Sequence, residues 1–221
     1  MGVENTITAF LEADGLQDWR LVGEGACAHY RTGSLAAGIR FAEAVARLDG
    51  ADRHPPAIDL RADGATVRLV TITEDHYGPG ETDLALAEAI SAVARDQGLE
   101  AEPEGIQTIQ VSIDALDRAE VMPFWRAVLG YEPRADSPDE DLIDPRGRGA
   151  FFWFQQMDRP RPQRNRIHVD VWVPHDRAEA RIEAALAAGG RMLSREFAPS
   201  WWVLADPEGN EACVCTALGR G

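Results

Sequence analysis

Residues 117–120 read Asp-Arg-Ala-Glu, and the same four residues return at 176–179. A glycine follows each copy at the same distance, Gly130 after the first and Gly189 after the second. An aspartate at the start of an apolar-periodic segment and a glycine after its end are start and stop signals of a helix. We therefore infer an internal duplication in which each copy contains one helix.

A second repeated motif supports the duplication. Asp-Pro-Arg-Gly at 144–147 corresponds to Asp-Pro-Glu-Gly at 206–209, and both read as tight turns between strands. Together with the flanking apolar segments, each copy predicts the order strand, helix, strand, strand, strand.

The first strand of each copy alternates between apolar and polar residues. The apolar set is Ile109, Val111 and Ile113 in the first copy and Ile167, Val169 and Val171 in the second. The polar set is Thr108, Gln110 and Ser112, then Arg166, His168, Asp170 and Trp172. A helix over the apolar face leaves the polar face open. We expect the two copies to join into one curved sheet whose polar concave face is a cup.

A polar stretch with Pro103 and Gly105 separates this duplicated part from the residues before it. We assign residues 1–103 to a first domain and residues 104–221 to a second. The first domain reads helix, two strands, helix, two strands, helix, with Asp63-Gly64 as a hairpin turn. Helices mixed with antiparallel strands predict an α+β fold for both domains.

Composition excludes several classes of function. The 221 residues carry a net charge of −15, and every basic residue is an arginine. This acidity argues against binding to nucleic acid or to an anionic membrane. The three cysteines form no CxxC pair, so we expect them to be reduced packing residues. No apolar run approaches the ~18 residues of a membrane span. The first residues include Glu4 and no basic segment, so we expect no signal peptide and a cytoplasmic protein.

The predicted cup combines aromatic, polar and cationic residues. Such a surface could hold a planar anionic ligand between rings and guanidinium groups. The residues that we expect to contact a ligand there are Gln110, Trp153, Gln155, Arg166, His168, Asp170, Trp172 and Trp202. In the alternative interpretation, the arginines at 159–166 belong to a linker between the copies and the tryptophans are core or interface residues.

The duplicated domain resembles the vicinal oxygen chelate superfamily, which includes glyoxalases, bleomycin-resistance proteins and extradiol dioxygenases. The resemblance covers residues 106–217 and rests on Phe-Trp-Arg-Ala-Val-Leu-Gly at 124–130 and Asp-Pro-Glu-Gly-Asn-Glu at 206–211. Because this superfold hosts many chemistries, it indicates a fold more than a function.

Metal enzymes of that superfamily place four His, Gln or Glu ligands on the concave strands. The matching positions here are Gln110, Gln155 or Gln156, His168 and Cys213. One imidazole with neutral amides is a poor divalent site unless Glu211 or Cys213 contributes. We therefore expect no metal and no bound cofactor, although a metal-dependent glyoxalase or dioxygenase remains an alternative.

Residues 8–98 resemble pterin-4a-carbinolamine dehydratase. The similar stretches are Arg53-His54-Pro55, Thr-Glu-Asp-His-Tyr-Gly at 73–78, Gly-Glu-Thr-Asp at 80–83, and the helix segment 41–46. The resemblance implies loss of water from a 4a-hydroxytetrahydropterin, a reaction that needs one group to take a proton and another to give one.

The implied catalytic residues are His54, Glu74 and His76, with Arg53 and Pro55 contacting the pterin. The sequence departs from the family because Arg53 and Glu74 replace two of its three histidines, and arginine is not an acid–base group at neutral pH. The alternative is a dehydratase-like fold retained for dimerisation or ligand binding.

Three functions follow from these patterns. The first is a hydro-lyase acting on a pterin carbinolamine, with the second domain as a ligand-binding or assembly module. The second is a non-catalytic binding protein that uses the C-terminal cup. The third is a metal-dependent enzyme of the glyoxalase type. Both resemblances imply a homodimer, and in each case we expect a small-molecule ligand.

Overall fold

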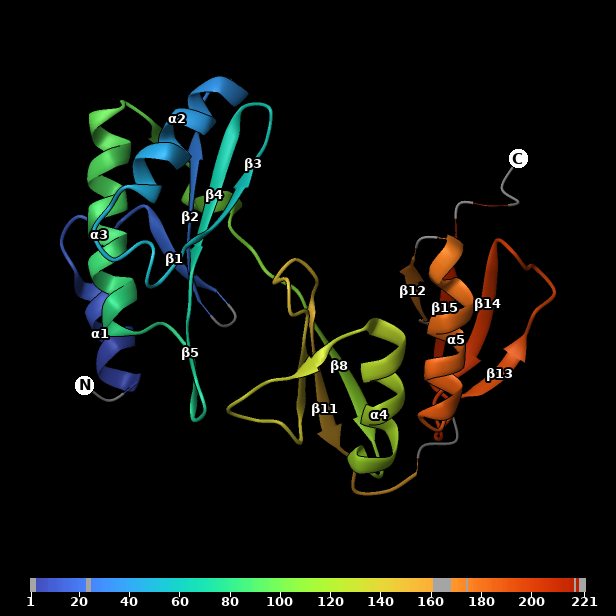
Figure 1. Cartoon of the computed structure of the whole chain (residues 1–221). Helices are drawn as coiled ribbons and strands as arrows, with labels where there is room; N and C mark the ends of the chain where they lie inside the picture. Colours follow the sequence, from blue (N-terminus) through green and yellow to red (C-terminus); the bar gives the residue numbers. More distant parts are fainter. Residues whose placement is uncertain (1–2, 23–24, 161–167, 174, 217, 219–221) are drawn as a thin grey trace. The chain divides into compact units, whose positions relative to one another are not determined.

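The computed structural model describes residues 3–22, 25–160, 168–173, 175–216 and 218. The chain divides into two compact units, Met1–Ile109 and Gln110–Gly221 (Figure 1). The boundary that we expected from the sequence follows residue 103. No helix among the described residues is long and apolar enough to cross a membrane.

The first unit contains three helices and an antiparallel sheet of strand order β1-β2-β4-β3, with β7 also paired to β2. The helices are α1 Val3–Glu12, α2 Leu35–Ala46 and α3 Glu81–Asp96, with a 3-10 turn η1 at Pro103–Gly105. The strands are β1 Trp19–Val22, β2 Gly25–Arg31, β3 Ala57–Leu60, β4 Gly64–Leu69 and β7 Glu100–Ala101. Strands β5 Thr71–Thr73 and β6 His76–Gly78 form a separate hairpin before α3.

The helices of the first unit cover one face of its sheet (Figure 1). Helix α2 begins where the Ser34 hydroxyl accepts a hydrogen bond from the Ala37 backbone N–H. Its buried Phe41 and Val45 lie four residues apart on one face, as helical periodicity requires. Phe41 meets Tyr30 of the sheet edge to face, with ring centroids 5.2 Å apart.

The second unit contains the duplication. The first repeat comprises β8 Gln110–Ala115, α4 Arg118–Leu129, β9 Glu132–Pro133, β10 Asp141–Ile143 and β11 Phe151–Gln156. The second comprises β12 Val169–Trp172, the 3-10 turn η2 His175–Arg177, α5 Ala178–Ala187, β13 Arg191–Ser194, β14 Trp201–Ala205 and β15 Glu211–Cys215. The strand orders β8-β11-β10-β9 and β12-β15-β14-β13 are the same. Each repeat therefore has the strand–helix–strand–strand–strand order expected from the sequence.

The expected joining of the repeats into one curved sheet is wrong for the single chain. Among the described residues, no strand of the first four-stranded sheet pairs with a strand of the second. Helices α4 and α5 contact each other instead, and both sheets pack on this helical layer (Figure 1). The helices bring Phe124, Val128, Ile182 and Ala185 into one common core. Consequently the two open sheet faces point away from each other.

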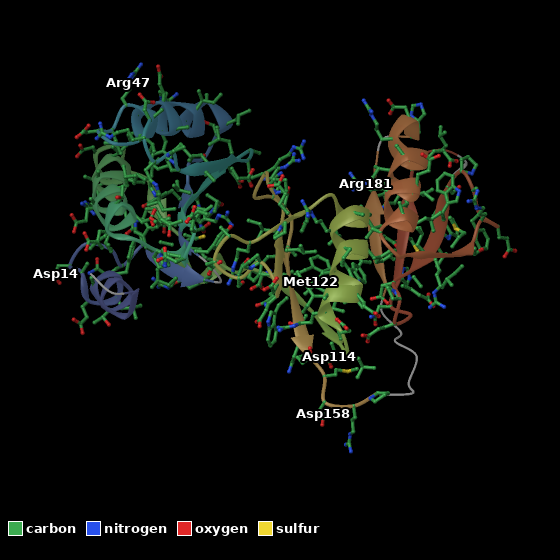
Figure 2. All side chains as sticks on the ribbon, turned by 60° about the horizontal axis from the view of Figure 1, so that its bottom comes forward. Asp14, Arg47, Asp114, Met122, Asp158 and Arg181 are labelled. Carbon is green, nitrogen blue, oxygen red and sulfur yellow. The ribbon has the colours of Figure 1, made fainter. Side chains whose placement is uncertain are left out.

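Contacts at the end of α4 hold the two helices together. Gly130 ends α4 with a φ of 72°, a left-handed conformation that glycine adopts without steric cost. Arg181 of α5, labelled in Figure 2, donates a hydrogen bond to the Val128 carbonyl at 2.8 Å. A cation beside the carbonyl end of a helix is favourable because the helix dipole is negative there.

Candidate functional site

The open face of the second sheet carries the clearest group of chemically active side chains. Strand β12 alternates, so Val169 and Val171 face the core while Asp170 and Trp172 face outward. Asp170 pairs with Cys213 of β15, and Trp172 pairs with Cys215. Directly paired residues project from the same face of a sheet, so these four side chains share the open face.

An imidazole, a carboxylate and a thiol meet at one end of this face. His168 Nδ1 lies 2.9 Å from Asp170 Oδ1, and Cys213 Sγ lies 3.6 Å from the same nitrogen. Potential ligand atoms of the three residues all lie within 4.8 Å of one another. His168 and Asp170 are half-exposed, whereas Cys213 is buried beneath them. We call these three residues the His–Asp–Cys cluster.

The thiol of this cluster is a weak acid. Burial, reinforced by the Asp170 carboxylate, raises the pKa of Cys213 to about 12. The side chain is therefore a neutral thiol at physiological pH and accepts or donates only weak hydrogen bonds.

The His–Asp–Cys cluster fits a metal ion better than the set expected from the sequence. Imidazole and carboxylate are ligands of zinc, and a bound zinc ion would displace the proton of the Cys213 thiol so that it could coordinate as a thiolate. Three protein ligands with an open fourth position are typical of catalytic zinc sites. Asp170 supplies the negative charge that a set of neutral amides lacks. Gln110 and Gln155 lie on the other sheet and do not join this cluster.

Aromatic side chains continue the open face beyond the cluster. Trp201 of β14 pairs with Cys215, so it lies on the same face as Trp172. Phe197 stacks on Trp201 with centroids 4.4 Å apart and planes 15° apart. Trp172 is 57% exposed and Phe197 is 47% exposed. We call Trp172, Trp201 and Phe197 the aromatic platform.

The remaining residues expected in the cup fall into three groups. Gln110, Trp153 and Gln155 project from the open face of the first sheet, where Trp153 pairs with Ser112. Trp202 lies on the opposite face of its sheet from Trp201 and is 6% exposed in the core, so it is a packing residue. Arg166, with Arg161 and Arg164, lies outside the described residues.

The two sets of polar side chains therefore do not meet within one chain. The open face with Gln110, Trp153 and Gln155 and the open face with the His–Asp–Cys cluster lie on opposite sides of the α4–α5 layer. A hollow of about 940 Å³ lies elsewhere, along α4 and the β9–β10 segment, and its lining includes Met122, Arg126 and Leu142.

A second candidate site lies in the first unit around His54. Its Nε2 atom lies 2.5 Å from Asp83 Oδ1, and Asp83 is fully buried. The other oxygen of Asp83 accepts hydrogen bonds from the Thr71 hydroxyl and the Gly80 backbone N–H, both at 2.7 Å. Asp83 thus holds the imidazole, strand β5 and the start of α3 together.

We call His54 and Asp83 the His54–Asp83 dyad. The other residues predicted for this site lie within the described part of the chain and do not bond to it. Arg53 is exposed and lies 3.5 Å from Asp49, and Pro55 is also exposed. Glu74 is exposed in the β5–β6 turn. His76 pairs with Thr73, so it projects from the same hairpin face as Thr71, which is two residues before Thr73. Between residues 49 and 83, all of them described, no hydrogen bond joins His54 to Glu74 or His76.

Sequence reasoning missed Asp83 as part of a site and did not predict the contacts that Asp170 makes. Asp83 was interpreted only as part of a helix opening, although an acidic residue three places after a helix cap is also placed to hold a neighbouring side chain. Asp170 was expected to face a ligand, but its contact with His168 and its place above Cys213 depend on the parallel pairing of β12 with β15. No local sequence signal predicts that pairing.

Residues 110–215 match the family described as a glyoxalase-like domain. A glyoxalase-related enzyme from Fulvimarina pelagi is 16% identical, with 51% of this chain and 88% of that chain covered and a TM-score of 0.38. A glyoxalase/bleomycin resistance protein/dioxygenase family enzyme from Burkholderia phytofirmans PsJN is 17% identical, with 49% and 97% covered and a TM-score of 0.40. A lactoylglutathione lyase from Agrobacterium tumefaciens is 15% identical, with 52% and 96% covered and a TM-score of 0.36.

Residues 110–215 therefore form a glyoxalase-like domain of the vicinal oxygen chelate type. No curated protein matches the chain. The comparisons give no support to the resemblance of residues 8–98 to pterin-4a-carbinolamine dehydratase.

Proposed function

We propose that the glyoxalase-like domain binds a small aromatic molecule on the open face of its second sheet. The observation that carries this proposal is the juxtaposition of the His–Asp–Cys cluster with the aromatic platform on one face. Ligand sites are lined mainly by apolar and aromatic side chains with a few convergent polar groups, and this face offers both kinds of side chain. The ligand stacks on Trp172 and Trp201, and its polar substituent bonds to His168 or Asp170.

A divalent metal ion of the zinc type would be held by His168, Asp170 and Cys213. When bound, it would supply Lewis-acid polarisation of a ligand oxygen. With or without the ion, Asp170 orients the His168 imidazole through Nδ1. The aromatic platform excludes water from one side of the ligand. Binding by hydrogen bonds alone uses the same residues without the ion.

The experiment measures thermal stability and tryptophan fluorescence with Zn²⁺ alone, catechol alone, and both together. A ligand present at a hundred times its Kd stabilises the folded state by about 2.7 kcal/mol, which a melting curve resolves. We expect His168→Ala and Trp172→Leu to abolish the shift. His175→Ala is the matched control, because His175 is an exposed histidine in the same domain outside the cluster. Responses that are equal in His168→Ala and in the wild type would contradict the proposal.

We also propose that a second copy of the chain completes the cup, making the protein a homodimer. Strands β8 and β12 are the edges of their sheets among the described residues, and their open faces carry the two halves of the expected ligand set. Light scattering with size-exclusion chromatography distinguishes a dimer from a monomer. A monomer at micromolar concentration that still binds ligand would contradict this arrangement.

A second candidate function, dehydration of a pterin carbinolamine, is favoured by the His54–Asp83 dyad. A buried carboxylate bonded to one imidazole nitrogen fixes the ring orientation and leaves the other nitrogen for proton transfer. His54 would exchange a proton with the substrate, and His76 on the adjacent hairpin face would be the second proton-transfer group.

The test for this activity follows 4a-hydroxytetrahydropterin dehydration by rapid-mixing absorbance. General acid–base groups contribute about 10²–10⁴-fold in rate, so His54→Ala should fall to the uncatalysed background. Arg47→Ala is the control, because Arg47 is an exposed arginine of the same unit that is not among the residues expected to contact the pterin. No acceleration by the wild-type protein would exclude the activity.

A further inference from the structure

The hollow of about 940 Å³ along α4 and the β9–β10 segment has an apolar base. Its lining includes Met122 of α4, labelled in Figure 2, with Pro133 of β9 and Leu142 of β10. Met122 and Leu142 are 8% and 1% exposed and belong to the core of the domain, so the hollow reaches down to buried apolar side chains. Its volume falls within the range of small-molecule sites, which are lined mainly by apolar residues.

Side-chain bonds hold one wall of the hollow in place. This wall is the segment between β9 and β10. Within it, Arg134 Nε lies 2.7 Å from Asp136 Oδ1, and Arg134 Nη2 lies 3.2 Å from Asp141 Oδ2. The Ser137 hydroxyl also donates a hydrogen bond to Asp141. Because the wall is already ordered, a ligand loses little binding free energy to ordering it.

One guanidinium of the lining is available to bind an anion. Arg126 is exposed, and its side chain forms no hydrogen bond or ion pair with any residue that the structure describes. Arg118, which also lines the hollow, is already paired with Glu140 at 2.5 Å. Met122 is four residues from each of the two arginines, so the three side chains share one side of α4. The unpaired cation therefore lies beside the apolar base.

Carboxylates of the lining limit the charge that a ligand can carry. Glu132 and Asp139 line the hollow and are exposed. Asp117 lines it too, but its carboxylate caps α4 by accepting hydrogen bonds from the backbone N–H groups of Ala119 and Glu120. Like charges repel, so a second negative charge on the ligand would be unfavourable here. The lining thus favours a monoanion over a dianion.

We propose that this hollow binds an apolar monocarboxylate, a molecule with an aliphatic chain and one carboxylate group. The chain packs on Met122, Leu142 and Pro133, and the carboxylate accepts hydrogen bonds from the Arg126 guanidinium. The lining of the hollow includes no residue of the His–Asp–Cys cluster or of the aromatic platform, all of which are described. The proposal therefore does not rest on the function proposed for the open sheet face.

The test is calorimetric titration of the full chain with octanoate and with three ligands that keep the chain and change the charge: octan-1-ol, octylammonium and octanedioate. We expect octanoate to bind saturably and the other three to bind at least about tenfold more weakly, because a hydrogen bond to a charged group contributes about that factor or more. Lengthening the ligand from hexanoate to octanoate should strengthen binding about fourfold for each buried CH₂.

Two variants at exposed positions locate the ligand. Arg126→Met should weaken octanoate binding about tenfold and leave octan-1-ol binding unchanged, because it removes the charge and keeps an apolar side chain. Ala119→Trp should abolish octanoate binding, because the indole fills part of the hollow. The matched controls are Arg177→Met and Ala180→Trp, at an exposed arginine and an exposed alanine of the same domain outside the lining. Both should bind octanoate as the wild type does.

Absence of saturable octanoate binding to the wild-type protein overturns the proposal. Octan-1-ol binding as tight as octanoate binding, or octanoate binding that is unchanged in Arg126→Met, overturns it as well, because the carboxylate contact is then missing. Octanoate binding that is lost in Trp172→Leu and retained in Ala119→Trp would place the ligand on the open sheet face, which also overturns the proposal for the hollow.

Discussion

The indole N–H of Trp125 donates a hydrogen bond to Asp206 Oδ2 at 2.9 Å, and both residues are buried. Trp125 belongs to α4 of the first repeat and Asp206 to the β14–β15 turn of the second, so this bond joins the two halves of the glyoxalase-like domain. The carboxylate of Glu208 from the same turn accepts from the backbone N–H groups of Leu116 and Asp117 at 3.0 and 2.8 Å. The turn therefore anchors the start of α4.

Asp206→Ala should destabilise the glyoxalase-like domain by about 2–4 kcal/mol, because it leaves the Trp125 indole unpaired and removes two bonds to Asn210. Urea unfolding followed by tryptophan fluorescence measures this change. Asp176→Ala, at an exposed aspartate of the same domain, is the control and should change stability by less than about 0.5 kcal/mol. Equal effects of the two variants would show that Asp206 does not join the repeats.

Gly130→Ala should destabilise the protein more than Gly98→Ala. Both glycines follow a helix with positive φ, 72° and 66°, so alanine is strained at each by about 1 kcal/mol. At Gly98 an added Cβ meets nothing within 4 Å, whereas at Gly130 it comes within 2.9 Å of the Arg181 guanidinium. Chemical denaturation measures how much more unfolding free energy Gly130→Ala loses than Gly98→Ala, and this difference reports the contact of Arg181 with α4. It should disappear in an Arg181→Ala background.

Cys213 should resist alkylation at neutral pH. Raising its pKa from 9.0 to about 12 lowers the thiolate fraction roughly a thousandfold, and only the thiolate is nucleophilic. The measurement is iodoacetamide labelling of a Cys27→Ser, Cys215→Ser protein between pH 7 and pH 9, where the rate should rise about tenfold per pH unit. Asp170→Asn should accelerate labelling, because the Asp170 carboxylate disfavours the thiolate. A rate already at its plateau at pH 9 would contradict the raised pKa.

Asp83→Ala should destabilise the first unit by about 2–4 kcal/mol. It removes the one carboxylate to which the His54 imidazole, the Thr71 hydroxyl and the Gly80 N–H are all hydrogen-bonded. Glu88→Ala, at an exposed carboxylate on the same helix, is the matched control. Circular dichroism during thermal unfolding records both variants. A loss no larger than that of Glu88→Ala would mean that Asp83 does not organise this junction.

The sequence predicted the elements of the fold better than their assembly. Asp117 and Gly130 mark the ends of α4, because caps and left-handed glycines act within a few residues. Whether the repeats join edge to edge or pack through their helices depends on contacts far apart in the sequence, such as Arg181 with Val128. Nothing in the local pattern distinguishes these two arrangements. The sequence therefore could not show that the repeats form two separate sheets, and the expectation of a single sheet was wrong.

For the candidate sites, the sequence predicted which side chains share a face of a strand but not which strands lie side by side. Alternation along β12 placed Asp170 and Trp172 on one open face, because side chains of a strand point alternately to its two sides. The same reasoning could not separate Trp201 from Trp202, since both are adjacent indoles and only the register with β15 decides which is buried.

The position of Asp83 also bears on how this protein and its descendants can evolve. Because the same carboxylate starts α3, anchors β5 and holds His54, selection for a stable fold would retain Asp83 after any chemistry at His54 had been lost. Retention of the aspartate among relatives would then say nothing about activity. The informative position is His54, since its imidazole is partly exposed and its replacement would leave the start of the helix intact.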